Sequence, residues 1–72
     1  MEFDIKVFSG RLRELRLEKG MSTIKLGKEL GFSDATISRW ENGLIHPGIS
    51  SLYKIAKYFN VTAGYLIGTE DN

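Results

Sequence analysis

The sequence contains no cysteine, one histidine and one proline among its 72 residues. Disulfide bonds are therefore excluded, and one histidine without cysteine supplies too few ligands for a structural zinc site. No apolar run approaches the roughly 18 residues of a membrane span, and the N-terminus lacks the basic and apolar regions of a signal peptide. We therefore expect a cytoplasmic protein without metal, cofactor, membrane contact or evident small-molecule ligand. Its stability must come from one apolar core, which 42% apolar residues and eight aromatic side chains allow it to build.

The net charge of +1 hides an uneven distribution of charge along the chain. All ten Lys and Arg residues lie between Lys6 and Lys57 together with only five acidic residues, so this stretch carries a net +5. The other four acids lie at the two ends of the chain, at Glu2, Asp4, Glu70 and Asp71. A basic centre with acidic ends is compatible with a polyanionic partner, and equally with an ordinary solvated surface of mixed charge.

The spacing of apolar residues predicts an all-α fold. Apolar side chains recur every three or four residues, and no segment of useful length alternates with a period of two. Capping residues and glycines divide the pattern into five short helices. We place them at Ile5 to Lys19-Gly20, from the cap Ser22 to Gly31, from the cap Ser33 to Gly43, from Ile49 to Asn60, and from the cap Thr62 to Gly68. Residues 1–72 are thus expected to form a single compact five-helix domain.

The stretch from Thr23 to Asn42 is the most informative part of the sequence. Only Gly31-Phe32-Ser33 joins the second and third helices, which is too short for antiparallel packing, so the two helices must cross steeply as in a helix-turn-helix. Gly27 has no side chain and permits close approach, and Gly31 supplies the positive φ of the turn. The crossing should bury the apolar residues Leu26, Leu30, Phe32, Ile37 and Trp40. Short or flexible side chains face outward between them, which favours DNA binding over an ordinary surface face.

One segment of this stretch, Thr36-Ile37-Ser38-Arg39-Trp40-Glu41-Asn42-Gly43, resembles the recognition-helix signature of the phage-repressor and Cro-type helix-turn-helix family, the XRE family. The similarity covers about residues 8–68, with further matching blocks in order at residues 11–16, 19–22, 30–33, 47–49, 54–56 and 65–68. It implies a lambda-repressor-like bundle of five helices in which helices 2 and 3 form the helix-turn-helix. It also implies a homodimer that binds a palindromic double-stranded DNA operator and regulates transcription in a bacterium or phage, and we expect a repressor.

The resemblance assigns roles to particular residues. Five residues of the third helix would face the major groove: Asp34, Ala35, Thr36, Ser38 and Arg39. Their chemistry agrees, because Arg can grip guanine O6 and N7, Asp can accept from cytosine N4, and the methyl groups of Ala and Thr can touch that of thymine. Phosphates would be held by backbone N–H groups near Ser22, Thr23, Asn42 and Gly43, and at longer range by Lys25, Lys28 and Arg11. For these three basic residues, ordinary solvated side chains are the alternative.

Other positions are expected to serve the fold. The resemblance pairs Arg16 with Glu41 in a partly buried structural salt bridge. Trp40 is expected in the core and His46 in an exposed loop. Apolar residues of the last helix, Tyr65, Leu66 and Ile67, are candidates for part of the dimer interface.

Three positions depart from the family pattern. Thr23 stands where many members carry a Gln that holds a phosphate and braces the recognition helix, and the shorter Thr is expected to do only the first. Lys25 replaces the Glu of the usual capping box, so the reciprocal cap is missing. Gly64 replaces a frequent Asp, which puts the last helical turn and any dimer contact there in question.

Two other classes of function were weighed. A protein-interaction module, such as an antitoxin or a controller component, could use the same outward face for a partner protein. DNA binding must weaken steeply with salt because counterions are released, whereas an apolar protein interface should not. An enzyme is disfavoured, since the chain lacks cysteine, has its one histidine in a loop, and has no carboxylate pair beside a base.

Overall fold

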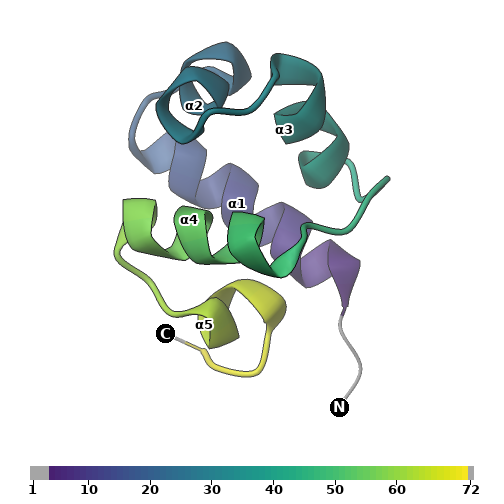
Figure 1. The fold of residues 1–72 in the computed structure, drawn as a ribbon. Helices are drawn as coiled ribbons and strands as arrows, with labels where there is room; N and C mark the ends of the chain where they lie inside the picture. Colours follow the sequence, from purple (N-terminus) through teal and green to yellow (C-terminus); the bar gives the residue numbers. More distant parts are fainter. Residues whose placement is uncertain (1–3, 72) are drawn as a thin grey trace.

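Five helices joined by short turns make up most of residues 4–71, the part of the chain that the computed structural model describes (Figure 1). They are α1 (Ile5–Glu18), α2 (Thr23–Leu30), α3 (Asp34–Glu41), α4 (Ile49–Phe59) and α5 (Ala63–Ile67). No strand occurs within this range, so the predicted all-α architecture of five helices is confirmed. The acidic residue Glu2 lies outside the described residues. No helix within residues 4–71 has the length and apolar character required to span a bilayer.

Side chains cap the helices at the positions that the sequence indicates. The hydroxyl groups of Ser22, Ser33 and Thr62 each accept a hydrogen bond from the backbone N–H three residues later, at 3.0, 3.1 and 2.9 Å. Such a cap satisfies one of the four N–H groups that a helix start leaves without a partner. Asp4 caps α1 in the same manner by accepting from the Lys6 N–H at 2.9 Å, a role that the sequence pattern did not reveal.

The core is built by all five helices. In Figure 1, α2 and α3 form the upper end of the molecule, α4 crosses the middle and α5 lies at the lower end, and α1 contacts both α3 and α5. Six side chains have no exposed surface: Phe8, Leu12, Leu26, Ile37, Ile55 and Leu66. Burying an aliphatic or aromatic side chain of this size contributes about 1.5–3 kcal/mol each. The core therefore holds the α2–α3 unit on α1 and α4.

Two aromatic residues of the expected core lie together, but only one is buried. Trp40 is 3% exposed, as expected, whereas Phe32 is only partly buried and packs its ring edge to face against Trp40 with centroids 4.9 Å apart. Leu66 requires a correction, since it was expected at a dimer interface but is fully buried in the core. A short five-residue helix has one side that packs against α1 and α4, and Leu66 lies on that side.

One buried ion pair connects α1 to α3. Arg16 Nε donates to Glu41 Oε2 at 2.6 Å and Arg16 Nη2 donates to Glu41 Oε1 at 2.8 Å, with the side chains only 11% and 6% exposed. The third donor, Nη1, donates to the Met21 carbonyl at 2.7 Å. Hydrogen bonding to Glu41 raises the pKa of Arg16 against the opposing effect of burial. The predicted structural salt bridge is present, in the bidentate geometry that arginine favours.

The last turn forms although Gly64 replaces the frequent Asp. The Gly64 carbonyl accepts hydrogen bonds from the backbone N–H groups of Thr69 and Glu70 at 2.9 and 3.2 Å. The Glu70 side chain folds back over Gly64, into the space that a Cβ would need, and accepts from the Thr62 hydroxyl at 2.9 Å. The departure at residue 64 therefore accommodates the C-terminal segment and leaves α5 intact.

Candidate nucleic-acid interface

The crossing of α2 and α3 depends on glycine at two positions. A Cβ atom on Gly27 would lie 2.5 Å from the backbone oxygen of Phe32, so only glycine lets the turn lie against α2. Gly31 ends α2 with φ of 83°, a conformation that side-chain-bearing residues rarely adopt. The Gly27 carbonyl accepts from the N–H groups of both Gly31 and Phe32 at 2.8 Å. The turn is therefore packed against α2 and hydrogen-bonded to it, which fixes where α3 begins.

The outward side of α3 carries the five residues predicted to read bases. Ile37 and Trp40 point into the core, while the opposite side of the helix presents small, polar and cationic groups. Of these five residues, Asp34, Ala35 and Arg39 are exposed. Thr36 and Ser38 are partly exposed. The structure thus brings these side chains together on one face.

Thr23 requires a correction. The sequence predicts that its short side chain reaches only a phosphate, but its hydroxyl donates a hydrogen bond to Asp34 Oδ1. Thr23 and Asp34 are the first residues of α2 and α3, and the steep crossing brings these two helix starts together. A side chain shorter than Gln therefore still braces the recognition helix, because the two helix ends lie closer than spacing along the chain indicates.

The start of α2 offers donors toward solvent. Ser22 Oγ accepts from the Lys25 N–H and keeps its own hydroxyl proton for another acceptor. Within residues 4–71 the structure gives no hydrogen-bond partner to the backbone N–H groups of Thr23 and Ile24. Free N–H groups at a helix start, reinforced by the helix dipole, form a site suited to a phosphate.

Asn42 and Gly43 do not offer the backbone donors that were expected of them. The Asn42 N–H donates to the Ser38 carbonyl at 3.0 Å, and the Gly43 N–H donates to the Trp40 carbonyl at 3.2 Å. The physical reason is that these residues follow a helix C-terminus, where N–H groups still point back along the helix and carbonyls are left over. The Asn42 side chain has a different role, since its Nδ2 contacts the Ser38 carbonyl and hydroxyl at 2.9 and 3.3 Å.

Arg11 also lies elsewhere than expected. Its Nη1 donates to the Tyr65 carbonyl and, at 2.7 Å, to the Glu70 carbonyl, and the guanidinium stacks over the Tyr65 ring at 4.4 Å. These partners belong to α5 and the segment after it, at the end of the molecule opposite α2 and α3 (Figure 1). Arg11 therefore fastens the C-terminal segment to α1, and it lies away from the other residues predicted to hold phosphates on α2.

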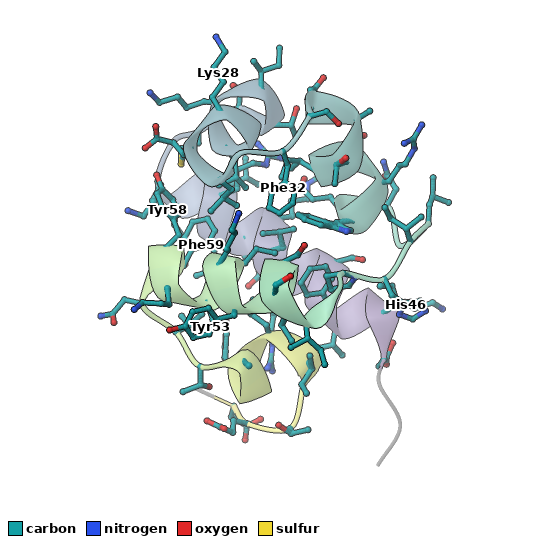
Figure 2. All side chains as sticks on the ribbon, viewed as in Figure 1. Lys28, Phe32, His46, Tyr53, Tyr58 and Phe59 are labelled. Atoms are coloured by element: carbon teal, nitrogen blue, oxygen red, sulfur yellow. The ribbon has the colours of Figure 1, made fainter. Side chains whose placement is uncertain are left out.

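The two lysines of α2 differ in their surroundings. Lys25 lies 3.9 Å from Glu29 in an exposed pair one helical turn apart, the kind of contact that contributes little to stability. Lys28 points away from the body of the molecule (Figure 2). Among residues 4–71, no acidic side chain forms an ion pair with it. Lys28 is thus available to a polyanion, and Lys25 is available after a weak contact breaks.

His46 is exposed in the loop after α3, as expected. Among residues 4–71, no three His, Cys, Asp or Glu side chains lie close enough to hold a metal ion.

The sequence analysis did not predict that Thr23 and Asn42 brace residues of α3. For Asn42 a signal was available, because it follows Ser38 by one helical turn.

The crossed helix pair, its glycine turn and the polar outer face of α3 define the chain as a helix-turn-helix domain. The comparison with protein families agrees: a model described as helix-turn-helix matches residues 12–66. The chain belongs to this family.

Curated relatives are transcriptional regulators. The chain is 36% identical over 64 residues to the HTH-type transcriptional activator BcrR of Enterococcus faecalis, which covers 89% of this chain but only 31% of BcrR. It is 40% identical over 50 residues to an HTH-type transcriptional regulator of Archaeoglobus fulgidus, covering 69% of this chain and 71% of the relative. The chain therefore spans less than a third of the length of BcrR.

Solved structures share the fold. The P22 c2 repressor in complex with a synthetic operator has a TM-score of 0.82 at 27% identity, covering 88% of this chain and 96% of the repressor. The restriction-modification controller protein C.AhdI of Aeromonas hydrophila has a TM-score of 0.78 at 28% identity over 88% of this chain and 96% of its own. Hydroxypropylphosphonic acid epoxidase of S. wedmorenis also matches, with a TM-score of 0.80 at 25% identity, but over only 36% of that enzyme.

Proposed function

We propose that this domain binds double-stranded DNA in a sequence-specific manner by placing α3 in the major groove, and that it thereby regulates transcription. The observation that carries the proposal is the outer face of α3, where small, polar and cationic side chains stand on a helix anchored by Ile37 and Trp40. The likeness to the P22 c2 repressor, whose structure contains an operator, supports the same use of the fold.

Bases and phosphates are assigned to different residues. Arg39 is suited to guanine O6 and N7, Asp34 to cytosine N4, and Ala35 with the Thr36 methyl group to thymine, while Ser38 can donate or accept. Phosphates are assigned to three further groups: the Ser22 hydroxyl, the free N–H groups of Thr23 and Ile24, and the side chains of Lys28 and Lys25. Each cationic contact releases counterions, so binding should weaken with salt.

We further propose that the domain binds as a homodimer on a palindromic operator. One eight-residue recognition helix reads only a few base pairs, and two half-sites about one helical turn apart supply the rest. Within residues 4–71, four of the six large exposed apolar side chains lie on the α3–α4 loop and the start of α4: Leu44, Ile45, Ile49 and Tyr53. These residues replace the buried Leu66 as the candidate contact between copies.

Repression is the simpler mode of regulation. A bound repressor needs only to occupy a promoter, whereas an activator must also contact the transcription machinery. The phage repressor RstR of Vibrio cholerae is 25% identical over 90% of this chain, although BcrR is named an activator. The match to the epoxidase covers only 36% of that enzyme, so it supports a shared fold and no proposal of catalytic activity for this chain.

A role on DNA would place the protein in the cytoplasm of its host.

The second candidate is a protein-interaction module, such as an antitoxin or controller component, whose partner protein would cover the helix-turn-helix face and extend over the neighbouring α3–α4 loop. The exposed apolar residues between Leu44 and Tyr53 are the observation that favours it. A partner protein covering this surface would bind with little dependence on salt, because apolar contacts release no counterions.

Selection of bound sequences from random duplex DNA tests the proposal. We expect a palindromic consensus whose half-sites are about one helical turn apart, with affinity that falls steeply between low and high salt. Enrichment of no sequence, with equal weak binding to all duplexes, would refute sequence-specific recognition. Sedimentation of the Ile49→Ser variant with the selected operator tests the contact between copies. If two copies of this variant bind the operator as cooperatively as the wild type does, the surface around Ile49 is not that contact.

A further inference from the structure

Helix α4 differs from the other helices in the sign of its charge. Its charged residues are Lys54 and Lys57, whereas α1, α2 and α3 each carry both signs and α5 carries no charged residue. Both lysines are exposed, and among residues 4–71 no acidic side chain forms an ion pair with either of them. The positive potential at this helix is therefore not neutralised by a neighbouring carboxylate.

The two lysines lie on the side of α4 that faces solvent. Ile55 and Phe59 are buried in the core on one side of the helix. Tyr53, Lys54 and Lys57 are all exposed and share the opposite side, because Lys57 follows the other two by four and three residues. These three residues are called the α4 face below.

Each lysine of the α4 face is held over an aromatic ring. The Lys54 Nζ atom lies 5.4 Å from the centroid of the Phe32 ring, and the Lys57 Nζ atom lies 5.5 Å from that of the Tyr53 ring. Figure 2 shows Phe32 above α4 and Tyr53 below it, so the two ammonium groups flank the exposed side of the helix. A ring occupies one side of an ammonium group and leaves N–H donors for an anion. Both cations are placed in advance, which reduces the entropy lost when an anion binds.

The covered rings distinguish between two classes of anionic partner. A single-stranded nucleic acid stacks its bases on free aromatic rings. Here a lysine covers one face of each ring, and the Phe32 ring is also packed edge to face on Trp40. A carboxylate needs no ring, because it accepts hydrogen bonds from the ammonium group itself. The apolar stems of lysines also suit the apolar side chains of a protein.

We propose that the α4 face docks an acidic segment of another protein, which places one carboxylate on Lys54 and another on Lys57. A second copy of this chain does not suit the lysines, because a twofold contact there would bring like charges together. Tyr53 lies at the border with the surface assigned to the contact between copies, and the two lysines lie beyond it. The α4 face and the outer side of α3 lie on different helices, so the docked segment and DNA can bind together.

NMR of the whole chain, titrated with a synthetic peptide rich in Glu and Leu, tests the location of binding. A second peptide with Gln in place of every Glu is the control. We expect the acidic peptide to shift the amide signals of α4 around Lys54 and Lys57, and the Gln peptide to leave them in place. Shifts that gather instead on α3 and the start of α2 would show that the peptide imitates DNA phosphates there, and would overturn the proposal.

Removal of two cations at two matched places tests the lysines. The Lys54→Gln, Lys57→Gln double variant should bind the acidic peptide about fivefold more weakly, the value of two exposed ion pairs. The Lys6→Gln, Arg13→Gln double variant loses the same charge from exposed positions of α1, and its affinity should stay close to that of the wild type. Equal losses in both double variants would assign binding to net charge and refute the proposal. Thermal melting checks folding, and the NMR map of the wild type decides if a double variant does not fold.

Two further ligands complete the test. Oligothymidylate that binds more tightly than the acidic peptide, and loses this affinity in the Lys54→Gln, Lys57→Gln double variant, would assign the α4 face to single-stranded nucleic acid and overturn the proposal. We expect the selected operator to bind together with the acidic peptide, whereas displacement of the peptide by the operator would refute a separate docking surface. If the protein selects no operator, the proposed function fails, and the peptide titrations still decide the role of the α4 face.

Discussion

The close approach of the helix-turn-helix turn to Gly27 gives a sharp prediction for the Gly27→Ala substitution. Ala is favoured over Gly in a helix interior by about 1 kcal/mol, so local propensity alone predicts a more stable protein. The new Cβ would lie 2.5 Å from the Phe32 carbonyl oxygen, where ordinary contact begins at 3.4 Å. The clashing atom belongs to the backbone and cannot rotate away, so the turn itself must move.

The expected size of the effect follows from these two opposing contributions. Overpacking costs about 1–3 kcal/mol, and we take the upper end because Phe32 is held by its backbone hydrogen bond to Gly27 and by its ring on Trp40. Subtracting the gain in propensity leaves a loss of about 2 kcal/mol, and each kcal/mol lowers Tm by roughly 4–8 °C in a domain of this size. We therefore expect the Gly27→Ala variant to melt roughly 8–16 °C below the wild type.

Gly10→Ala is the matched control. Gly10 lies in α1, is exposed, and has no atom within 4 Å of the position of an added Cβ. The change from Gly to Ala at this position should therefore show only the effect of helix propensity, and it should raise the free energy of unfolding by about 1 kcal/mol. Thermal and urea unfolding followed by circular dichroism measure both variants. If Gly27→Ala melts at or above the wild type, or both variants shift in the same direction, the close packing of the turn is not what requires glycine.

Further substitutions separate the roles of individual residues. Glu41→Ala should destabilise the fold by about 3 kcal/mol, because it leaves Arg16 charged and buried without its partner, and an unchanged Tm would show that the pair is superficial. Arg39→Ala should lose about 1–3 kcal/mol on the best operator and relax preference at one base pair per half-site, whereas equal losses on scrambled DNA would make it a phosphate contact. Lys28→Ala should weaken binding to all sequences alike and lower the salt slope by about one unit per contact, and an unchanged slope would remove it from the interface. Arg11→Ala should lower Tm and increase proteolysis of residues 69–71 with no change in salt slope, while a reduced slope would return it to the DNA.

The helix boundaries were predictable because the signals that set them are local. Ser33 and Thr62 cap the helices that follow them, and Asn60 and Gly68 end α4 and α5 in the left-handed conformation, as the sequence pattern indicates. Each signal acts within about one helical turn, so it can be read without knowledge of the tertiary fold. The core followed for a similar reason, since apolar spacing identifies the buried side of each helix.

The structure differs from the sequence predictions for two kinds of group. One kind has hydrogen-bond partners far away along the chain, and the other consists of backbone groups whose availability depends on the direction of the preceding helix. Arg11 is separated from its acceptors at Tyr65 and Glu70 by more than fifty residues, and nothing in the local sequence shows that its guanidinium reaches α5. The backbone donors of Asn42 and Gly43 were misplaced for a different reason. Family position indicated that the loop faces DNA, but the polarity of a helix C-terminus leaves carbonyls available there, and this could have been deduced from the predicted end of the helix.

The corrections change how recognition by α3 is divided among its side chains. Asp34 is held by Thr23, Ser38 is contacted by the Asn42 amide, and Thr36 is bonded to Ser33, so most polar groups of the outer face are oriented before DNA arrives. Groups oriented in advance lose little conformational freedom on binding, and they therefore discriminate between bases by geometry. Arg39 differs, because residues 4–71 give its side chain no hydrogen-bond partner, and up to about 2 kcal/mol of side-chain entropy is lost when it is ordered. The contact that Arg39 makes must exceed this loss, which only a bidentate partner such as guanine supplies readily. If α3 reads bases as proposed, the held residues define where the helix fits, and Arg39 contributes affinity only once they fit.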